Sequence, residues 1–136
     1  MSAVAHVITF RSSKFDVTKE RPNLINPIAG ESVLAWLREQ LKSSSYEVTT
    51  PDTEDWGWYV YVKAAEATYL VGASADATEY TDSDIDWTIQ IHRERSLKDR
   101  ITGANKLTAD DRLSRLIENI VRAEPAIQGV EVDRDA

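Results

Sequence analysis

The sequence predicts an α+β domain in which a largely antiparallel sheet buries one face under two helices. Two observations favour this class. Short runs with period-2 alternation recur along the chain, and two other segments carry apolar residues at helical spacing. The expected order is strand, helix, four strands, helix, strand. Because the chain has 136 residues and no repeat or linker divides it, we expect a single domain over residues 1–136.

The first quarter of the chain predicts a strand, a loop and a helix. Residues 4–10, VAHVITF, are β-branched and aromatic on both sides of the period-2 pattern, as in a strand covered on both faces. Residues 11–31 mix charges with proline and glycine and predict a long loop. An amphipathic helix is expected from Ser32, with leucines spaced at i, i+3 and i+7: Leu34, Leu37 and Leu41.

The middle of the chain predicts four strands. Residues 46–51 form a short strand that ends at a proline, and 56–63 and 66–73 form an antiparallel hairpin. Residues 86–94 alternate cleanly between apolar and polar side chains and form the fourth strand. Before the hairpin we expect an acidic turn that contains Asp52, Glu54 and Asp55.

The last quarter predicts a helix and a terminal strand after a basic connector. Thr108 and Asp111 form a T-x-x-D signal for a helix start, and the helix should end before Pro125. Its apolar residues follow at helical spacing: Leu113, Leu116, Ile117, Ile120 and Val121. Residues 126–132 then form the terminal strand.

Strand parity divides the aromatic segment into a core face and a candidate binding face. The alternate residues expected in the core are Trp58, Val60, Val62, Trp87, Ile89 and Ile91. The opposite face should carry Tyr59, Tyr61, Gln90, His92 and Glu94. Since tyrosine presents a rigid ring and a hydroxyl group, such a face suits a ligand or a partner. The alternative is that loops or a second subunit merely cover it.

A basic run follows the fourth strand and suggests a place for an anion. Its candidate residues are Arg93, Arg95, Lys98 and Arg100, ahead of a helix start. The alternative is that these side chains pair weakly with surface carboxylates. The run lacks the G-x-x-x-x-G-K-[ST] pattern of a P-loop, and we expect no cofactor.

No metal centre is predicted. The segment DSDID places Asp82, Asp84 and Asp86 at alternate positions, as in a calcium loop, but an EF-hand would need glycine and glutamate where Trp87 and Arg93 stand. A weak cation site in the loop that contains Asp76, Glu79, Asp82 and Asp84 stays open as an alternative.

No catalytic residue is assigned. The chain has two histidines, His6 in an expected buried strand and His92 on the candidate face, and no cysteine. The patterns G-x-S-x-G and H-E-x-x-H are absent. We therefore expect a small interaction domain. The alternative is a small-ligand binder or enzyme with a pocket formed by His92, Glu94, Tyr59 and Tyr61, and a concave pocket among these four side chains would favour it.

Composition narrows the compartment and the partners. The lack of cysteine fits a reducing compartment, and the N-terminal segment lacks the charged region and length of a signal peptide, so we expect a cytoplasmic protein. A net charge of −7 disfavours nucleic acid and anionic lipid as partners. It suits a protein partner or a homodimer, including a role in neutralising a basic partner as toxin-immunity proteins do.

Two motifs carry a resemblance to other proteins. The stretch NPIAGESVLAWL, followed by PDTEDWGWY, resembles small uncharacterised bacterial proteins that share an N-P-I-x-G helix start and an E-D-W-G-W motif. The resemblance covers roughly residues 22–72. It implies a bacterial origin and one domain, and it implies no activity.

Overall fold

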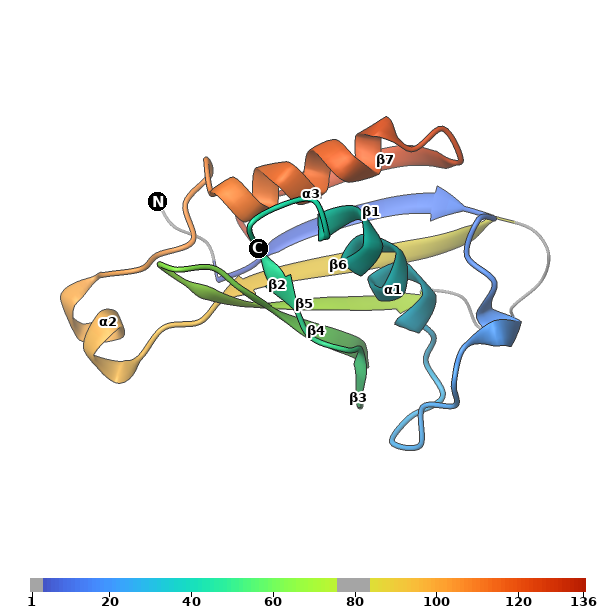
Figure 1. The fold of residues 1–136 in the computed structure, drawn as a ribbon, viewed down its shortest axis with the longest axis horizontal. Helices are drawn as coiled ribbons and strands as arrows, with labels where there is room; N and C mark the ends of the chain where they lie inside the picture. The colour runs from blue at the N-terminus through green and yellow to red at the C-terminus, as the bar shows by residue number, and fades with distance from the viewer. Residues whose placement is uncertain (1–3, 76–83) are drawn as a thin grey trace.

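The computed structural model describes residues 4–75 and 84–136, which form a seven-stranded antiparallel sheet with helices on one side (Figure 1). The strands are β1 (His6–Ser12), β2 (Glu47–Val48), β3 (Asp52–Glu54), β4 (Gly57–Lys63), β5 (Thr68–Ala75), β6 (Ile85–Arg93) and β7 (Ile127–Asp133). Their order across the sheet is β2-β4-β5-β6-β1-β7, and β3 also pairs with β4. The predicted α+β class is confirmed.

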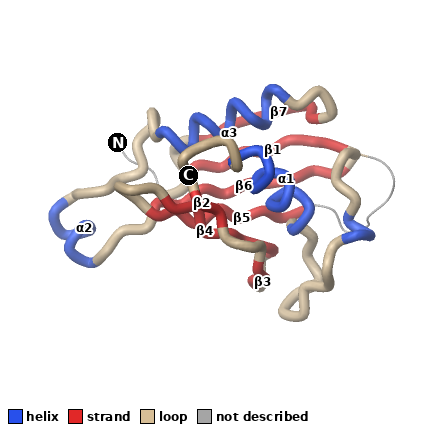
Figure 2. The backbone as a smooth tube through the Cα atoms, viewed as in Figure 1, coloured by secondary structure: helices blue, strands red, loops and turns tan. Residues whose placement is uncertain are grey.

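Two of the three described helices pack against the same face of the sheet. They are α1 (Glu31–Leu41) and α3 (Arg112–Ala123), and both lie in front of the strands in Figure 1. The third helix, α2 (Leu97–Thr102), projects beyond the end of the sheet, and a short 3₁₀ turn, η1 (Val17–Lys19), precedes α1 (Figure 2). In the described ranges no helix is long and apolar enough to cross a membrane.

The core lies between the sheet and the two packed helices. The strand residues that parity assigned to the core are all buried: Trp58, Val60, Val62, Trp87, Ile89 and Ile91. The helices contribute the predicted leucines and isoleucine, among them Leu34, Leu37, Leu41, Leu113 and Ile117. Burial of this continuous apolar cluster is the main source of the stability of the fold.

A carboxylate from the preceding loop caps the start of α1. The N-cap residue is Gly30, which has no side chain to accept a hydrogen bond, and Glu20 takes that role. One Glu20 oxygen accepts from the backbone N–H of Gly30 and of Glu31, and the other accepts from the N–H and hydroxyl of Ser32. Gly30 is required for close approach, because a Cβ there would lie 2.2 Å from the Ala73 carbonyl oxygen.

The prediction that the first strand is covered on both faces is wrong. In β1 only alternate residues are buried, including His6, Ile8 and Phe10, which face the helices. On the other face Thr9 is partly exposed and Arg11 is exposed. The β-branched residues on this side fit the pleat of a strand without needing a second layer above it.

The expected acidic turn is a strand in its own right. Residues 52–54 form β3, which pairs with the start of β4 through a turn at Asp55 and Trp56. The expected strand over 46–51 is shortened to β2, which pairs with the end of β4. Thus two very short strands share one long partner. Pro51, which separates them, has no N–H to donate to the ladder.

Two predictions at the C-terminal helix and the basic connector need correction. The helix starts one turn later than the T-x-x-D signal indicates, because Asp111 itself is the N-cap and accepts from the Ser114 N–H. The connector contains α2, which the apolar pattern did not show. A Ser96–Asp99 capping box begins α2, and Gly103, with a left-handed φ of 78°, ends it.

Candidate binding face

The sheet face opposite α1 and α3, here called the open face, carries the predicted binding residues on neighbouring strands. Tyr61, Leu70 and His92 lie side by side across β4, β5 and β6, and Tyr59, Gly72 and Gln90 form the adjacent row. Their side chains other than glycine are partly exposed. Glu94, the fifth predicted residue, is exposed just past the end of β6.

The indole of Trp56 packs against this face at a glycine. A Cβ on Gly72 would lie 2.3 Å from the Trp56 Cη2 atom and 2.4 Å from Cζ3, so only glycine leaves room for the indole. Because Gly72 lies between Tyr59 and Gln90 in its row, Trp56 stands between the two halves of the open face. The sequence alone placed Trp56 at the start of the strand over residues 56–63 and assigned it no contact on this face.

One end of the open face combines tyrosine rings with carboxylates. The rings of Tyr59 and Tyr61 meet edge to face with centroids 5.6 Å apart, and Asp52 on β3 is directly opposite Tyr59. Burial, aided by the nearby charges of Asp52 and Glu54, raises the pKa of the Tyr59 hydroxyl. We call Asp52, Glu54, Tyr59 and Tyr61 the acidic–aromatic patch.

The carboxylates of this patch have no partner of opposite charge among the described residues. Asp52 accepts a hydrogen bond from the Thr53 N–H, and Glu54 accepts one from the Asp55 N–H, and neither forms an ion pair. The patch therefore presents negative charge beside aromatic rings, which suits a cation.

The other end of the open face is concave. A cleft of about 800 Å³ lies where β6 runs into residues 94–107, here called the α2 arm. Its sheet side is formed by Trp56, Leu70, Gln90 and His92. Its far side includes Arg93, Glu94, Arg95 and Arg100. Tyr59 and Tyr61 do not line it, so the structure brings together only two of the four side chains of the expected His/Glu/Tyr pocket.

The four predicted anion-binding residues differ in their surroundings. Arg93 is held by Asp111, Tyr69 and Asn105, and Arg95 donates to the backbone oxygens of Asp99 and Ala104. Lys98 and Arg100 are exposed, and their side chains make no hydrogen bond or ion pair to another described residue. Three of the four line the cleft, and Lys98 does not.

His92 is a neutral polar group at the floor of the cleft. Burial lowers the pKa of its imidazole below 6.5, and its Nε2 lies 3.3 Å from the Gln90 side-chain oxygen. In the described structure no hydrogen bond or ion pair connects His92 with Glu94. The described structure thus shows no direct coupling between these two side chains.

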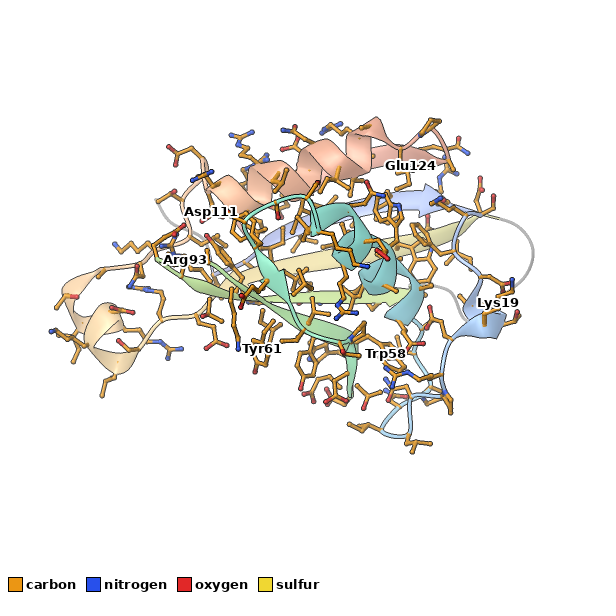
Figure 3. The ribbon with its side chains drawn as sticks, in the orientation of Figure 1. Lys19, Trp58, Tyr61, Arg93, Asp111 and Glu124 are labelled. Atoms are coloured by element: carbon orange, nitrogen blue, oxygen red, sulfur yellow. The ribbon has the colours of Figure 1, made fainter. Side chains whose placement is uncertain are left out.

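A second polar cluster, which the sequence did not reveal, lies inside the fold. Asp111 accepts from the Tyr69 hydroxyl at 2.9 Å and pairs with Arg93 at 3.2 Å (Figure 3). One turn along α3, the Ser114 hydroxyl lies 2.6 Å from His6 Nδ1. Ser114 and His6 are fully buried, so no substrate reaches this serine–histidine contact. We assign the cluster to the fold.

The structure describes only part of the loop that was considered as a weak cation site. The described residues hold no group of three or more histidine, cysteine, aspartate or glutamate side chains arranged for a metal ion. The loop considered for a weak cation site includes Asp76, Glu79 and Asp82, which lie outside the described residues.

Comparison of this chain with protein-family models, with curated proteins and with solved structures found no match. The resemblance to small bacterial proteins stays a prediction. The functional argument therefore depends on the chemistry of the open face.

Proposed function

We propose that this protein is a small cytoplasmic interaction domain that binds a basic partner protein through its open face. The observation that carries the proposal is the acidic–aromatic patch. It sets two tyrosine rings, packed edge to face, beside carboxylates that no described cation neutralises. Exposed aromatic residues on a rigid sheet offer large contact area at low cost in conformational entropy.

The chemistry of the patch fits the side chains of lysine and arginine. A partner cation can pair with Asp52 or Glu54 while its alkyl or guanidinium part packs on the ring of Tyr59 or Tyr61. The net charge of −7 acts at longer range, because it accelerates encounter with a basic protein. A partner of this kind also explains why the patch is not screened by the chain's own basic residues.

The side chains of the open face are suited to binding a partner rather than to catalysing a reaction. His92 has a polar neighbour in Gln90 but no hydrogen bond to a nucleophile or a carboxylate in the described residues. The buried serine–histidine contact is closed to substrate. These observations favour an interaction domain over an enzyme.

The test uses two patch variants and one control. Tyr61→Ala removes a ring and Asp52→Asn removes a charge, whereas Gln40→Ala changes an exposed residue on α1, on the opposite side of the sheet. Proteins captured from native lysate by each version are identified by mass spectrometry. Each specific partner is then purified and titrated against all four proteins by calorimetry.

The proposal requires a basic partner whose affinity falls about tenfold or more, about 1.4 kcal/mol, in both patch variants and stays unchanged in Gln40→Ala. Equal affinity for all four proteins would overturn it. Sedimentation is measured on the same samples. If the protein is a dimer that Tyr61→Ala dissociates, the occupant of the face is a second copy, and the proposal of a basic partner is wrong.

A further inference from the structure

The cleft at the other end of the open face has the opposite charge from the acidic–aromatic patch. Arg95 and Arg100 both line it, and neither forms an ion pair in the described part of the chain. The charge of Arg93 is matched by Asp111, which leaves Glu94 as the one carboxylate among the lining residues. The cleft is thus locally cationic in a protein whose net charge is −7.

The arginines of the cleft are not held in the same way. The Arg95 guanidinium is fixed by the backbone oxygens of Asp99 and Ala104, at 2.9 and 3.0 Å. The nearby carboxylate on which its charge acts, Asp99, does not line the cleft. The side chain of Arg100 is exposed on α2 and makes no hydrogen bond to another described residue. One fixed and one adjustable guanidinium at the same rim suit an anionic group, because arginine donates to carboxylate and phosphate oxygens in pairs. The Nε atom of Arg93, another residue that lines the cleft, is buried without an acceptor among the described residues.

The sheet side of the cleft supplies an apolar surface. The indole of Trp56 packs against Gly72, and the side chain of Leu70 lies in the next row. Gln90 and His92 add neutral polar groups beside them, because burial keeps the His92 pKa low and its imidazole uncharged near neutral pH. The volume of about 800 Å³ lies in the range of small-molecule sites.

We propose that the cleft binds a small organic anion that carries a planar ring. The ring packs on Trp56 and Leu70, and the anionic group lies at Arg95 and Arg100. This inference goes beyond the proposed function, because it concerns the cationic end of the open face and a small molecule. Carboxylates and phosphates share the required chemistry, and the probes below distinguish them.

The experiment titrates isotope-labelled protein at fixed ionic strength and follows its NMR spectrum. The probes are phenyl phosphate, benzoate, benzyl alcohol and inorganic phosphate, which separate the contribution of the ring from that of the anion. We expect phenyl phosphate or benzoate to bind with roughly millimolar affinity, at least tenfold tighter than benzyl alcohol and inorganic phosphate. The shifted signals should include the Trp56 indole N–H and the Gln90 side-chain amide.

Matched arginine variants test the anion site. Arg100→Ala should weaken the tighter probe about tenfold, the loss expected for a charge-assisted hydrogen bond in a partly exposed site. Arg112→Ala changes an exposed arginine at the start of α3 that does not line the cleft, and it should leave the affinity unchanged. Since the side chain of Arg100 has no described partner, its replacement should also leave the unfolding free energy unchanged.

Three outcomes overturn the inference. They are equal binding of benzyl alcohol and the anionic aromatic probes, equal losses in Arg100→Ala and Arg112→Ala, or signal changes that exclude Trp56 and Gln90. None of these outcomes changes what is expected for partner binding by Tyr61→Ala. The proposal for the cleft and the proposal for the acidic–aromatic patch can therefore be refuted independently.

Discussion

Replacement of Asp111 is the most informative perturbation of the fold, because one carboxylate serves two structural roles. One oxygen pairs with Arg93 at 3.2 Å and accepts from Tyr69, and the other caps α3 by accepting from the Ser114 N–H at 3.1 Å. The side chains of Asp111 and Arg93 are 1% and 16% exposed, so the pair is largely withdrawn from water.

The two roles can be separated by the choice of substitution. Asp111→Asn keeps an oxygen that caps the helix but removes the charge, and we expect it to cost about 3 kcal/mol because the Arg93 guanidinium then stays buried without its counter-ion. Asp111→Ala also removes the cap, which adds about 1 kcal/mol. The total of about 4 kcal/mol is a large fraction of the stability of a domain of this size.

Urea unfolding, followed by tryptophan fluorescence and by circular dichroism, measures both variants. The control is a double-mutant cycle with Arg93→Met. The loss of unfolding free energy in Arg93→Met/Asp111→Asn should be smaller, by more than about 1 kcal/mol, than the sum of the losses in the two single variants. A cost below about 1 kcal/mol for Asp111→Asn, with no coupling to Arg93, would refute this reasoning, because the pair would then behave as a solvent-screened surface pair.

Three further predictions concern the helix cap, the core and pH. Glu20→Ala should cost about 1–2 kcal/mol in urea unfolding, because α1 loses the carboxylate that caps its first turn, whereas an unchanged midpoint would mean that water replaces the carboxylate. Trp58→Ala and Trp87→Ala should each cost about 3–5 kcal/mol, and losses below about 1 kcal/mol for both would show that the core face is wrongly assigned. Burial, reinforced by the nearby charges of Arg134 and Arg115 and opposed by those of Asp111 and Asp133, lowers the pKa of the His6 imidazole below 6.5. His6 therefore binds a proton more weakly in the folded protein than in the unfolded chain, so the unfolding free energy should decline as pH falls through 6.5. This decline should be smaller in His6→Asn.

Strand parity was predictable because the central strands are regular. In β4 and β6 the side chains alternate without a bulge, so the apolar set that includes Trp58 and Trp87 falls on one face and Tyr61 and His92 on the other. The period of 2 is a property of the backbone and does not depend on which strands become neighbours.

The short helix α2 escaped prediction for a physical reason. It buries none of its residues, and its apolar side chains Leu97 and Ile101 are 75% and 77% exposed, so no amphipathic pattern directs it to the core. The signal that was present is local. Ser96 and Asp99 have the S-x-x-D spacing of a capping box, and Gly103 supplies a left-handed end.

Contacts between distant segments were beyond the reach of the sequence pattern. Arg93 and Asp111 are 18 positions apart, and they meet because the end of β6 lies next to the start of α3. The sequence placed Arg93 among anion-binding candidates because its neighbours are basic. Its burial and its carboxylate partner depend on strand order, which periodicity does not determine.

Gly72 lies in the row of residues that joins the two ends of the open face. Across the ladder its neighbours are Tyr59, in the acidic–aromatic patch, and Gln90, in the cleft. The indole of Trp56 fills the space that a side chain at Gly72 would take. One aromatic ring therefore separates a surface suited to cations from one suited to anions, and both surfaces lie on paired strands whose opposite sides are packed in the core. Because hydrogen-bonded strands hold these side chains more rigidly than a loop would, changes at the open face should alter binding with little effect on the packing beneath it.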